Sequence, residues 1–148
     1  MKLGFLFSGQ GSQTVGMGKN LYDASAEARG VFDLAEETLG MPLKKYLFEG
    51  PEETLTRTDV TQPAICLVSL AALRVARSAG LRPHAACGHS LGEYAALVSA
   101  GAVGEADALR IVAQRGRAMQ SAADAAPGKM AAVVGLGPRL IDVERWGG

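Results

Sequence analysis

The sequence predicts an α/β fold in which helices flank a parallel β-sheet, with a serine on a sharp turn at one edge of that sheet. Two observations lead to this fold class. Short apolar runs alternate with longer segments whose apolar residues recur at helical spacing, and strands that alternate with helices favour a parallel sheet. In addition, residues 88–92 fit the pattern G-x-S-x-G between an expected strand and an expected helix, which is the context that a serine nucleophile requires.

The first part of the chain is expected to form one strand and one long helix. Residues 3–7 are apolar and predict a buried strand, which leads into a glycine-rich turn over residues 9–13. Ser25 can cap a helix over residues 26–39, and Gly40 is its expected end. The expected core face of this helix consists of Ala28, Val31, Phe32, Ala35 and Leu39.

The middle of the chain is expected to alternate between helices and a second strand. Residues 41–59 carry turn signals and predict two short helices joined by a loop. Residues 63–79 are apolar almost all round and predict a buried central helix. Residues 84–88 predict the second strand. Apolar residues recur at helical spacing over 90–99 and 105–123, which predicts two further helices. The expected core face of the last helix consists of Leu109, Val112, Ala113, Gly116 and Met119.

Composition excludes several classes of protein. With 148 residues, 48% of them hydrophobic, the chain is long and apolar enough to bury one core. Fifteen basic residues balance 15 acidic ones, so neither nucleic acid nor an anionic membrane is expected as a partner. The longest mainly apolar stretch, 64–73, is too short to span a bilayer. Cys66 and Cys87 are too few for a disulfide framework or a zinc site. We expect two buried thiols in a cytoplasmic protein without a metal.

Ser90 is the candidate nucleophile. On a sharp turn between a strand and a helix, its hydroxyl would project from the carboxyl edge of the sheet, and Gly88 and Gly92 would avoid clashes there. The helix that follows offers free N–H groups and a partial positive charge. The N–H of Leu91 is then placed to bind a developing oxyanion. The alternative is a serine that merely caps the helix.

The turn over residues 9–13 is expected to lie beside Ser90. It follows a strand, but it lacks the lysine of a phosphate-binding loop and the third glycine of a dinucleotide fingerprint. Both turns would lie at the carboxyl edge of one parallel sheet. The N–H of Gln10 is therefore a second candidate oxyanion donor.

Candidates for a base and for a charged substrate contact are few. A serine nucleophile needs a base, but His84 lies at the wrong end of its strand and His89 points away from its neighbour on a tight turn. Three arginines, Arg110, Arg115 and Arg117, share the last long helix. Each is either a solvated surface residue or a guanidinium that enters the site and pairs with a substrate carboxylate.

Four sequence blocks occur in an order that resembles a known enzyme family. They are FSGQGSQTVGMG at 7–18, TQPA at 61–64, GHSLGEY at 88–94 and RGRAMQ at 115–120. Together they resemble the N-terminal half of the malonyl-CoA:acyl carrier protein transacylases. The resemblance implies the large subdomain of an α/β-hydrolase-like acyltransferase.

The resemblance also implies an activity and a set of site residues. The family transfers a malonyl group from coenzyme A to acyl carrier protein through an acyl-serine intermediate, in fatty-acid or polyketide synthesis, and coenzyme A enters as a thioester substrate rather than as a cofactor. By this resemblance Ser90 is the nucleophile, and Gln10 and Leu91 form the oxyanion hole. Arg115 binds the malonyl carboxylate, and Gln62 supports the site.

The chain departs from the family pattern in two ways. Ser8 stands where the family commonly has proline. The catalytic histidine of the family lies beyond the part that this chain resembles, and His89 is not its equivalent. We therefore expect an incomplete large subdomain over residues 1–127, inactive alone. Residues 128–148 would contain the first strand of a ferredoxin-like small subdomain, over 130–136, followed by an irregular tail. The unpaired edge of that strand would favour self-association.

Two other functions stay open from the sequence. The chain could be an interaction module that needs a second chain, which an open sheet edge would favour. It could also be a serine hydrolase or thioesterase, which the G-x-S-x-G turn by itself would fit. Arg115 separates the hydrolase from a malonyl transferase, because a hydrolase of neutral acyl groups has no use for a guanidinium in its site, whereas a malonyl site does.

Overall fold

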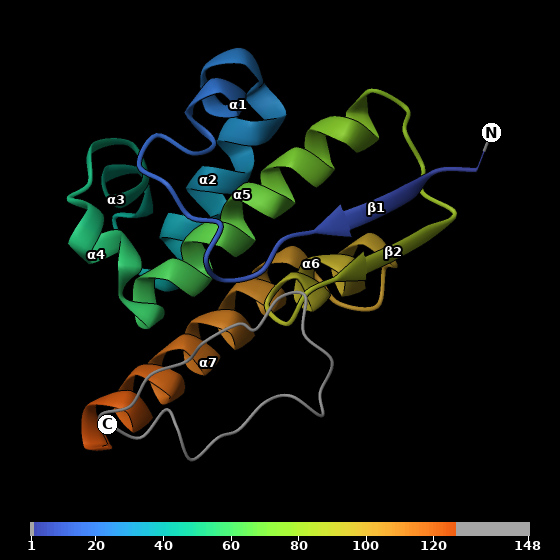
Figure 1. Ribbon diagram of the computed structural model, residues 1–148. Coiled ribbons are helices and arrows are strands. Elements are labelled where there is room, and N and C mark those ends of the chain that lie inside the picture. The colour runs from blue at the N-terminus through green and yellow to red at the C-terminus, as the bar shows by residue number, and fades with distance from the viewer. Residues whose placement is uncertain (1, 127–148) are drawn as a thin grey trace, which may run out of the picture.

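A parallel two-stranded sheet lies beside a cluster of helices in the computed structural model, which describes residues 2–126 (Figure 1). Strands β1 (Gly4–Phe7) and β2 (Ala85–Gly88) pair in parallel, with Gly4 opposite Ala85 and Phe7 opposite Gly88. The predicted parallel sheet is confirmed for these two strands. The expected strand over 130–136 and the small subdomain over 128–148 lie outside the described residues.

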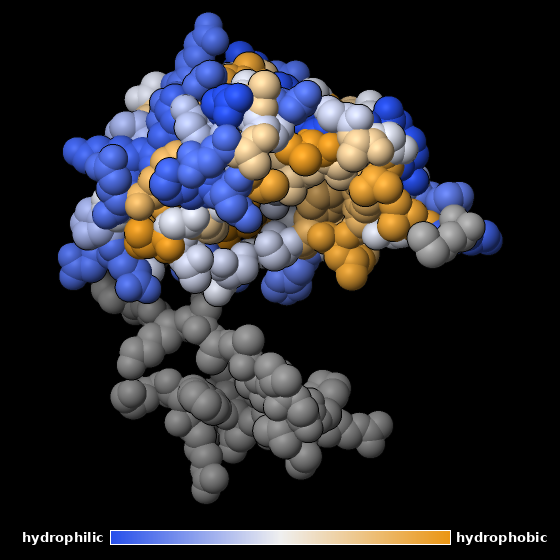
Figure 2. All heavy atoms as spheres, turned by 90° about the horizontal axis from the view of Figure 1, so that it is seen from above, coloured by the Kyte–Doolittle hydropathy of each residue, from blue (hydrophilic) through white to orange (hydrophobic). Residues whose placement is uncertain are grey.

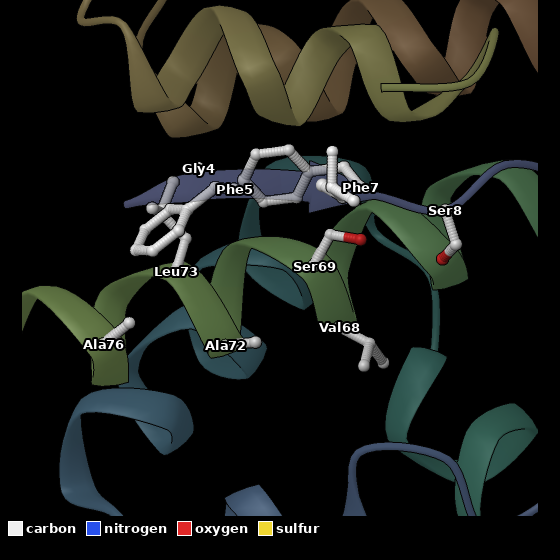
Figure 3. Close-up of a pocket in the computed structure, with 10 residues that line it drawn as sticks. Gly4, Phe5, Phe7, Ser8, Val68, Ser69, Ala72, Leu73 and Ala76 are labelled. Atoms are coloured by element: carbon white, nitrogen blue, oxygen red, sulfur yellow. The ribbon is translucent and has the colours of Figure 1, made fainter. Parts of the chain in front are cut away.

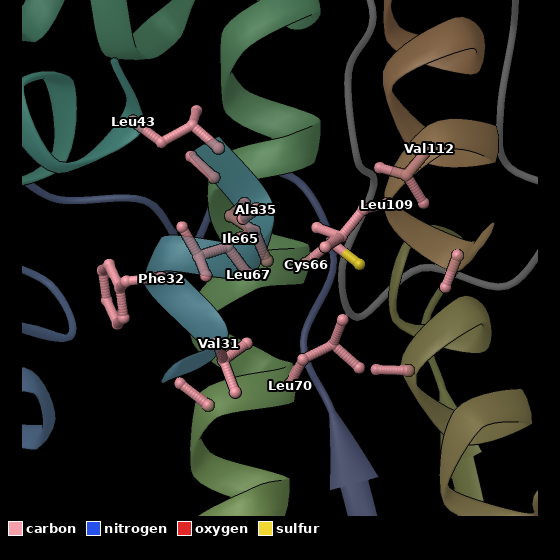
Figure 4. Packing of buried hydrophobic residues seen from close by; sticks show 14 of the residues in the cluster. Val31, Phe32, Ala35, Leu43, Ile65, Cys66, Leu67, Leu70, Leu109 and Val112 are labelled. Carbon is pink, nitrogen blue, oxygen red and sulfur yellow. The ribbon is translucent and has the colours of Figure 1, made fainter. Parts of the chain in front are cut away.

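Helix α5 (Thr58–Ser78) is the central element of the core. It packs against α2 (Ala26–Leu39) on one side and α7 (Glu105–Ala125) on the other (Figure 4). By length and hydropathy α5 could cross a membrane, but 61% of its most apolar window is buried inside the fold. Its apolar character is therefore explained by its place in the core, as expected from the absence of a polar face.

Helix α5 begins five residues before the expected start at Pro63. The residue that precedes it at the N-cap position, Arg57, provides no capping side chain. The first turn is instead held by other parts of the chain. The N–H of Thr58 donates to the side-chain oxygen of Gln120, at 2.9 Å, and the hydroxyl of Thr61 donates to the carbonyl of Leu55. These contacts come from tertiary structure, so local helix signals did not reveal them.

The other helices follow local signals closely, with one exception. Helix α2 has the predicted bounds, because the Ser25 hydroxyl accepts from the N–H of Ala28 and Gly40 adopts a left-handed conformation. Helices α3 (Leu43–Glu49) and α4 (Glu52–Thr56) are the two predicted short helices. Helix α1 (Lys19–Ala24) was not predicted, since it has no buried residue and therefore no apolar periodicity.

The two strands are buried less than the sequence predicts. Helix α6 (Gly92–Ser99) packs against both strands, while the open face of the sheet carries Gly4, Leu6, Ala85 and Cys87, all exposed. The prediction that Cys87 is buried is wrong, because nothing in residues 2–126 covers this face. Cys66 is buried as predicted.

A groove runs beside β1, at the edge that does not pair with β2. It has a volume of about 400 Å³, and Figure 2 shows hydrophobic side chains gathered around a hollow on this side of the molecule. Phe5 and Phe7 from β1 lie near Ser69 and Leu73 from α5 in Figure 3. We call this hollow the β1–α5 groove. Leu6, which is 83% exposed, lies at its rim.

Candidate active site

The turn that joins β2 to α6 carries Ser90 in a strained conformation. Among residues 2–126, Ser90 is the only residue other than glycine with a positive φ, at 53°. Backbone strain of this kind costs on the order of 1–3 kcal/mol, and it persists where the surrounding structure imposes it. The side chain is exposed at the end of β2, so its hydroxyl is open to a ligand.

Two glycines impose this turn. A Cβ added at Gly88 would overlap the carbonyl group of Gly92, and a Cβ at Gly92 would overlap the carbonyl of Phe7 and lie 2.8 Å from that of Ser8. The spacing of the motif therefore reflects two close backbone approaches, one within the turn and one between α6 and the end of β1.

The glycine-rich turn after β1 packs directly on the Ser90 turn. Gly9 is buried, and a Cβ there would lie 2.6 Å from the carbonyl oxygen of His89. The hydroxyl of Ser12 donates to the carbonyl of Gly9 at 2.8 Å and closes the turn. Within residues 2–126, the N–H groups of Gln10 and Leu91 donate to no other residue. Both N–H groups are thus available to an acceptor from a ligand.

Arg115 reaches the serine from α7. One terminal nitrogen of its guanidinium donates to Ser90 Oγ at 2.8 Å, and the other donates to Gln62 Oε1 at 2.7 Å. The neighbouring arginines differ: Arg110 pairs with Asp107 at the surface, and Arg117 is exposed. Of the three arginines that the sequence offers, the structure brings only Arg115 to the serine.

Gln62 anchors this arginine from α5. Its side chain is fully buried, which makes it one of two buried polar residues in the described core. Its amide nitrogen lies 3.4 Å from Gln10 Oε1 and 3.1 Å from Met119 Sδ. Because a buried amide must satisfy its polar atoms, these contacts hold the carboxamide with its oxygen toward Arg115.

Met119 belongs to this site, although its spacing predicts a place on the core face of its helix and no site role was expected for it. It is half-buried, and its sulfur contacts Gln62. It follows Arg115 by four residues, so the two side chains lie on one face of α7. That spacing is the signal that could have identified it.

In the described part of the chain, the side chain of neither histidine forms a hydrogen bond with Ser90 Oγ. His84 Nδ1 accepts from the backbone N–H of Leu3 at the opposite end of the strands. The backbone N–H of His89 donates to the carbonyl of Phe7. Within residues 2–126, Arg115 provides the only hydrogen bond to Ser90 Oγ. The same residues contain no group of three or more potential metal ligands.

Comparisons with known proteins agree on one family. The family model for the acyl transferase domain matches residues 4–143 of the sequence. The malonyl CoA-acyl carrier protein transacylase of Bacillus subtilis (strain 168) is 47% identical over 135 residues, which are 91% of this chain and 43% of that protein. The chain therefore spans less than half the length of this curated relative.

Solved structures give the same result. The malonyl CoA-acyl carrier protein transacylase from Clostridium perfringens aligns with a TM-score of 0.78 and 44% identity, over 82% of this chain and 39% of that one. A malonyl-transacylase in complex with a type II polyketide synthase acyl-carrier protein aligns with a TM-score of 0.78 and 41% identity, over 82% and 40% of the two chains.

Proposed function

Since this chain belongs to the acyl transferase domain family, we propose that it is the nucleophile-bearing part of an enzyme that transfers a malonyl group from malonyl-CoA to acyl carrier protein. The names of its relatives support this reaction. The observation that carries the proposal is the position of Arg115, whose guanidinium contacts both Ser90 Oγ and the buried Gln62.

Arg115 suits an acyl group that ends in a carboxylate. In a malonyl ester of Ser90, one methylene separates the ester carbonyl from the free carboxylate, so a cation in contact with Oγ is within reach of that carboxylate. The planar guanidinium can donate two parallel hydrogen bonds to it. Among residues 2–126, Arg115 forms none of the ion pairs with acidic side chains.

The proposed reaction has two acyl-transfer steps. Ser90 Oγ attacks the thioester carbonyl, its proton passes to a base, and coenzyme A leaves as the thiol. The thiol of acyl carrier protein then attacks the seryl ester, which frees the serine and forms the new thioester. In both steps the N–H groups of Gln10 and Leu91 would stabilise the oxyanion. We assign the base to the family histidine, which lies beyond the part of the family that this chain resembles.

Acyl carrier protein is the proposed acceptor, since one structural neighbour is a malonyl-transacylase in complex with such a protein. The relatives fit either fatty-acid or polyketide synthesis. We propose a cytoplasmic enzyme that needs no cofactor, with the coenzyme A thioester as its substrate.

The covalent step can be tested with malonyl-CoA and intact-protein mass measurement. The chain is mixed with a complement, defined as the part of the Bacillus subtilis relative that lies C-terminal to the aligned region. We expect one malonyl adduct per chain, mapped to Ser90 and absent from Ser90→Ala. Without the complement the adduct should form far more slowly, because loss of a base removes most of the rate of such enzymes. An adduct that persists in Ser90→Ala would refute the assignment.

A second candidate function, an interaction module that pairs with another polypeptide, is favoured by the open sheet. Among the described residues β1 pairs only with β2, so alternate backbone groups of β1 face outward along the β1–α5 groove. Leu6 lies between this groove and a second hollow of about 300 Å³ beside Cys87. We propose that an extended apolar segment of the complement occupies this surface.

The other alternative, a serine hydrolase of neutral acyl groups, does not account for the contact of Arg115 with Ser90 Oγ.

Thiol labelling tests the second candidate. With iodoacetamide at neutral pH, we expect Cys87 of the isolated chain to react and Cys66 to remain protected. Burial raises the pKa of Cys66 to about 12, and the thiolate is the reactive form. Binding of the complement should protect Cys87, as measured by the mass of the cysteine-containing peptides. If Cys87 reacts equally fast in the complex, this surface is not the contact.

A further inference from the structure

The last turns of α7 touch the first turn of α5 at two points. Gly116 is buried there, and a Cβ at this position would lie 2.9 Å from the carbonyl oxygen of Thr58. One turn later, the side-chain oxygen of Gln120 accepts from the N–H of Thr58 at 2.9 Å. Arg57 contributes no capping side chain, and Gln120 supplies from another helix an acceptor for the first N–H of α5, which has no partner within the helix.

The orientation of the Gln120 carboxamide is set by its other end. Its amide nitrogen donates to Asp124 Oδ1 at 2.9 Å, one turn further along α7. A carboxylate accepts hydrogen bonds and cannot donate them, so the amide nitrogen faces Asp124 and the oxygen faces Thr58.

A series of polar contacts leads from Thr58 back to α7. The hydroxyl of Thr58 accepts from Gln10 Nε2 at 3.4 Å, and Gln10 Oε1 accepts from Gln62 Nε2 at 3.4 Å. Gln62 Oε1 in turn accepts from Arg115. We call these contacts the glutamine network. They join α7, the first turn of α5 and the glycine-rich turn, and they pass through the buried carboxamide that anchors the arginine.

The position of Gln62 depends on the first turn of α5. Thr58 and Gln62 are four residues apart and therefore lie one above the other on the same helical face. If the N–H of Thr58 lost this acceptor, the first turn would fray, because that N–H has no other partner within the described residues. Gln62 would then lose its fixed position, and one terminal nitrogen of the Arg115 guanidinium would lose its hydrogen bond to Gln62 Oε1.

We propose that Gln120 is a positioning residue for malonyl transfer, because it caps the first turn of α5 and so holds Gln62 and the Arg115 guanidinium at Ser90. The side chain of Gln120 forms no hydrogen bond with Ser90 or with the Arg115 side chain within the described residues. The role of Arg115 toward the carboxylate rests on the proposed function, but the effect of Gln120 on Arg115 does not.

The test uses side-chain NMR signals of the 148-residue chain. The first variant, Gln120→Ala, removes the acceptor. The second, written Gln120→Glu for short, combines Gln120→Glu with Asp124→Asn, so that it keeps an oxygen that can accept from Thr58 while an amide at position 124 replaces the carboxylate beside it. Gln114→Ala is the matched control, since Gln114 is an exposed residue on the same helix and its side chain forms no hydrogen bond within the described residues. The signals followed are the Arg115 Nε–H and the carboxamide NH₂ of Gln62.

We expect Gln120→Ala to shift and broaden both signals, Gln120→Glu to restore them, and Gln114→Ala to leave them unchanged. If Gln120→Ala lowers the melting temperature but both signals keep their positions in the folded protein, Gln120 has a structural role alone and the inference is wrong. Circular dichroism identifies a variant that fails to fold, and Gln120→Glu then carries the test: displaced signals in this variant would also overturn the inference.

A second measurement separates this inference from the proposed function. In the chain with its complement, Gln120→Ala should raise the KM for malonyl-CoA about tenfold, with a smaller change in kcat, because a misplaced guanidinium weakens binding of the carboxylate. An unchanged KM beside altered Arg115 and Gln62 signals would support the role of Gln120 and contradict the malonyl assignment. Unaltered signals would refute the role of Gln120 whatever the substrate is.

Discussion

Replacement of Arg115 by alanine is expected to remove the preference for malonyl-CoA over acetyl-CoA in the chain with its complement. The guanidinium is held by Gln62 Oε1 and Ser90 Oγ, where it can form two charge-assisted hydrogen bonds with the malonyl carboxylate. Loss of such a paired charge typically costs about 2–5 kcal/mol. We therefore expect kcat/KM for malonyl-CoA to fall on the order of 100-fold or more, by the conversion of about 1.4 kcal/mol per tenfold.

Acetyl-CoA and two further variants are the controls for this prediction. Transfer of acetyl, which lacks the carboxylate, should change little in Arg115→Ala. Arg117→Ala removes an exposed arginine from the same helix and should leave both rates intact. Arg115→Lys keeps the positive charge but lacks the planar guanidinium that donates two parallel hydrogen bonds, so it should recover only part of the malonyl rate. Equal losses for malonyl and acetyl in Arg115→Ala would favour a hydrolase-like site in which the arginine has no role in selectivity.

Replacement of Gly92 by alanine is expected to cause a large loss of stability. The added Cβ would overlap the carbonyl of Phe7 and lie 2.8 Å from that of Ser8. These are backbone atoms at the end of β1, so no flexible side chain can move aside. Overpacking typically costs about 1–3 kcal/mol and occasionally more, and we expect about 3 kcal/mol here. That is a large share of the roughly 5–15 kcal/mol by which domains are stable.

Urea unfolding followed by circular dichroism measures this loss. Gly4→Ala is the matched control. Gly4 lies on β1, the strand whose end Gly92 approaches, and a Cβ at Gly4 would meet only the carbonyl oxygen of Ala85, at an ordinary 3.9 Å. We expect the midpoint of Gly4→Ala to stay near that of the parent chain. Equal midpoints for the two variants would show that α6 can move away from β1 at little cost, and the close approach at Gly92 would then not define the turn.

Local sequence signals predicted the elements whose boundaries depend on neighbouring residues. Helix α2 begins and ends where Ser25 and Gly40 indicate, because a cap is formed within one turn of chain. The two strands and α7 were predicted for similar reasons: apolar spacing reports which face of an element is buried. The expected core residues Leu109, Val112, Ala113 and Gly116 are indeed buried.

Other features depended on contacts between distant parts of the chain. The start of α5 is held by Gln120, 62 residues away along the sequence, so no local pattern could place it. The exposure of Cys87 follows from an open sheet face rather than from its apolar neighbours. The spacing of the three arginines on α7 did not distinguish them, and only the family resemblance singled out Arg115. The packing of α7 against α5 is what brings Arg115 rather than the others to Ser90.

The sequence by itself determined the family, the order of the elements and the residue types of the candidate site, because motifs and apolar periodicity are properties of short segments. The tertiary structure decided which of these residues meet. Ser90, Gln10, Gln62 and Arg115 come from four different segments, and their contacts require the close approaches at Gly9, Gly92 and Gly116. Such approaches depend on how whole elements pack, and packing at this level is a property of the folded chain rather than of any short segment within it.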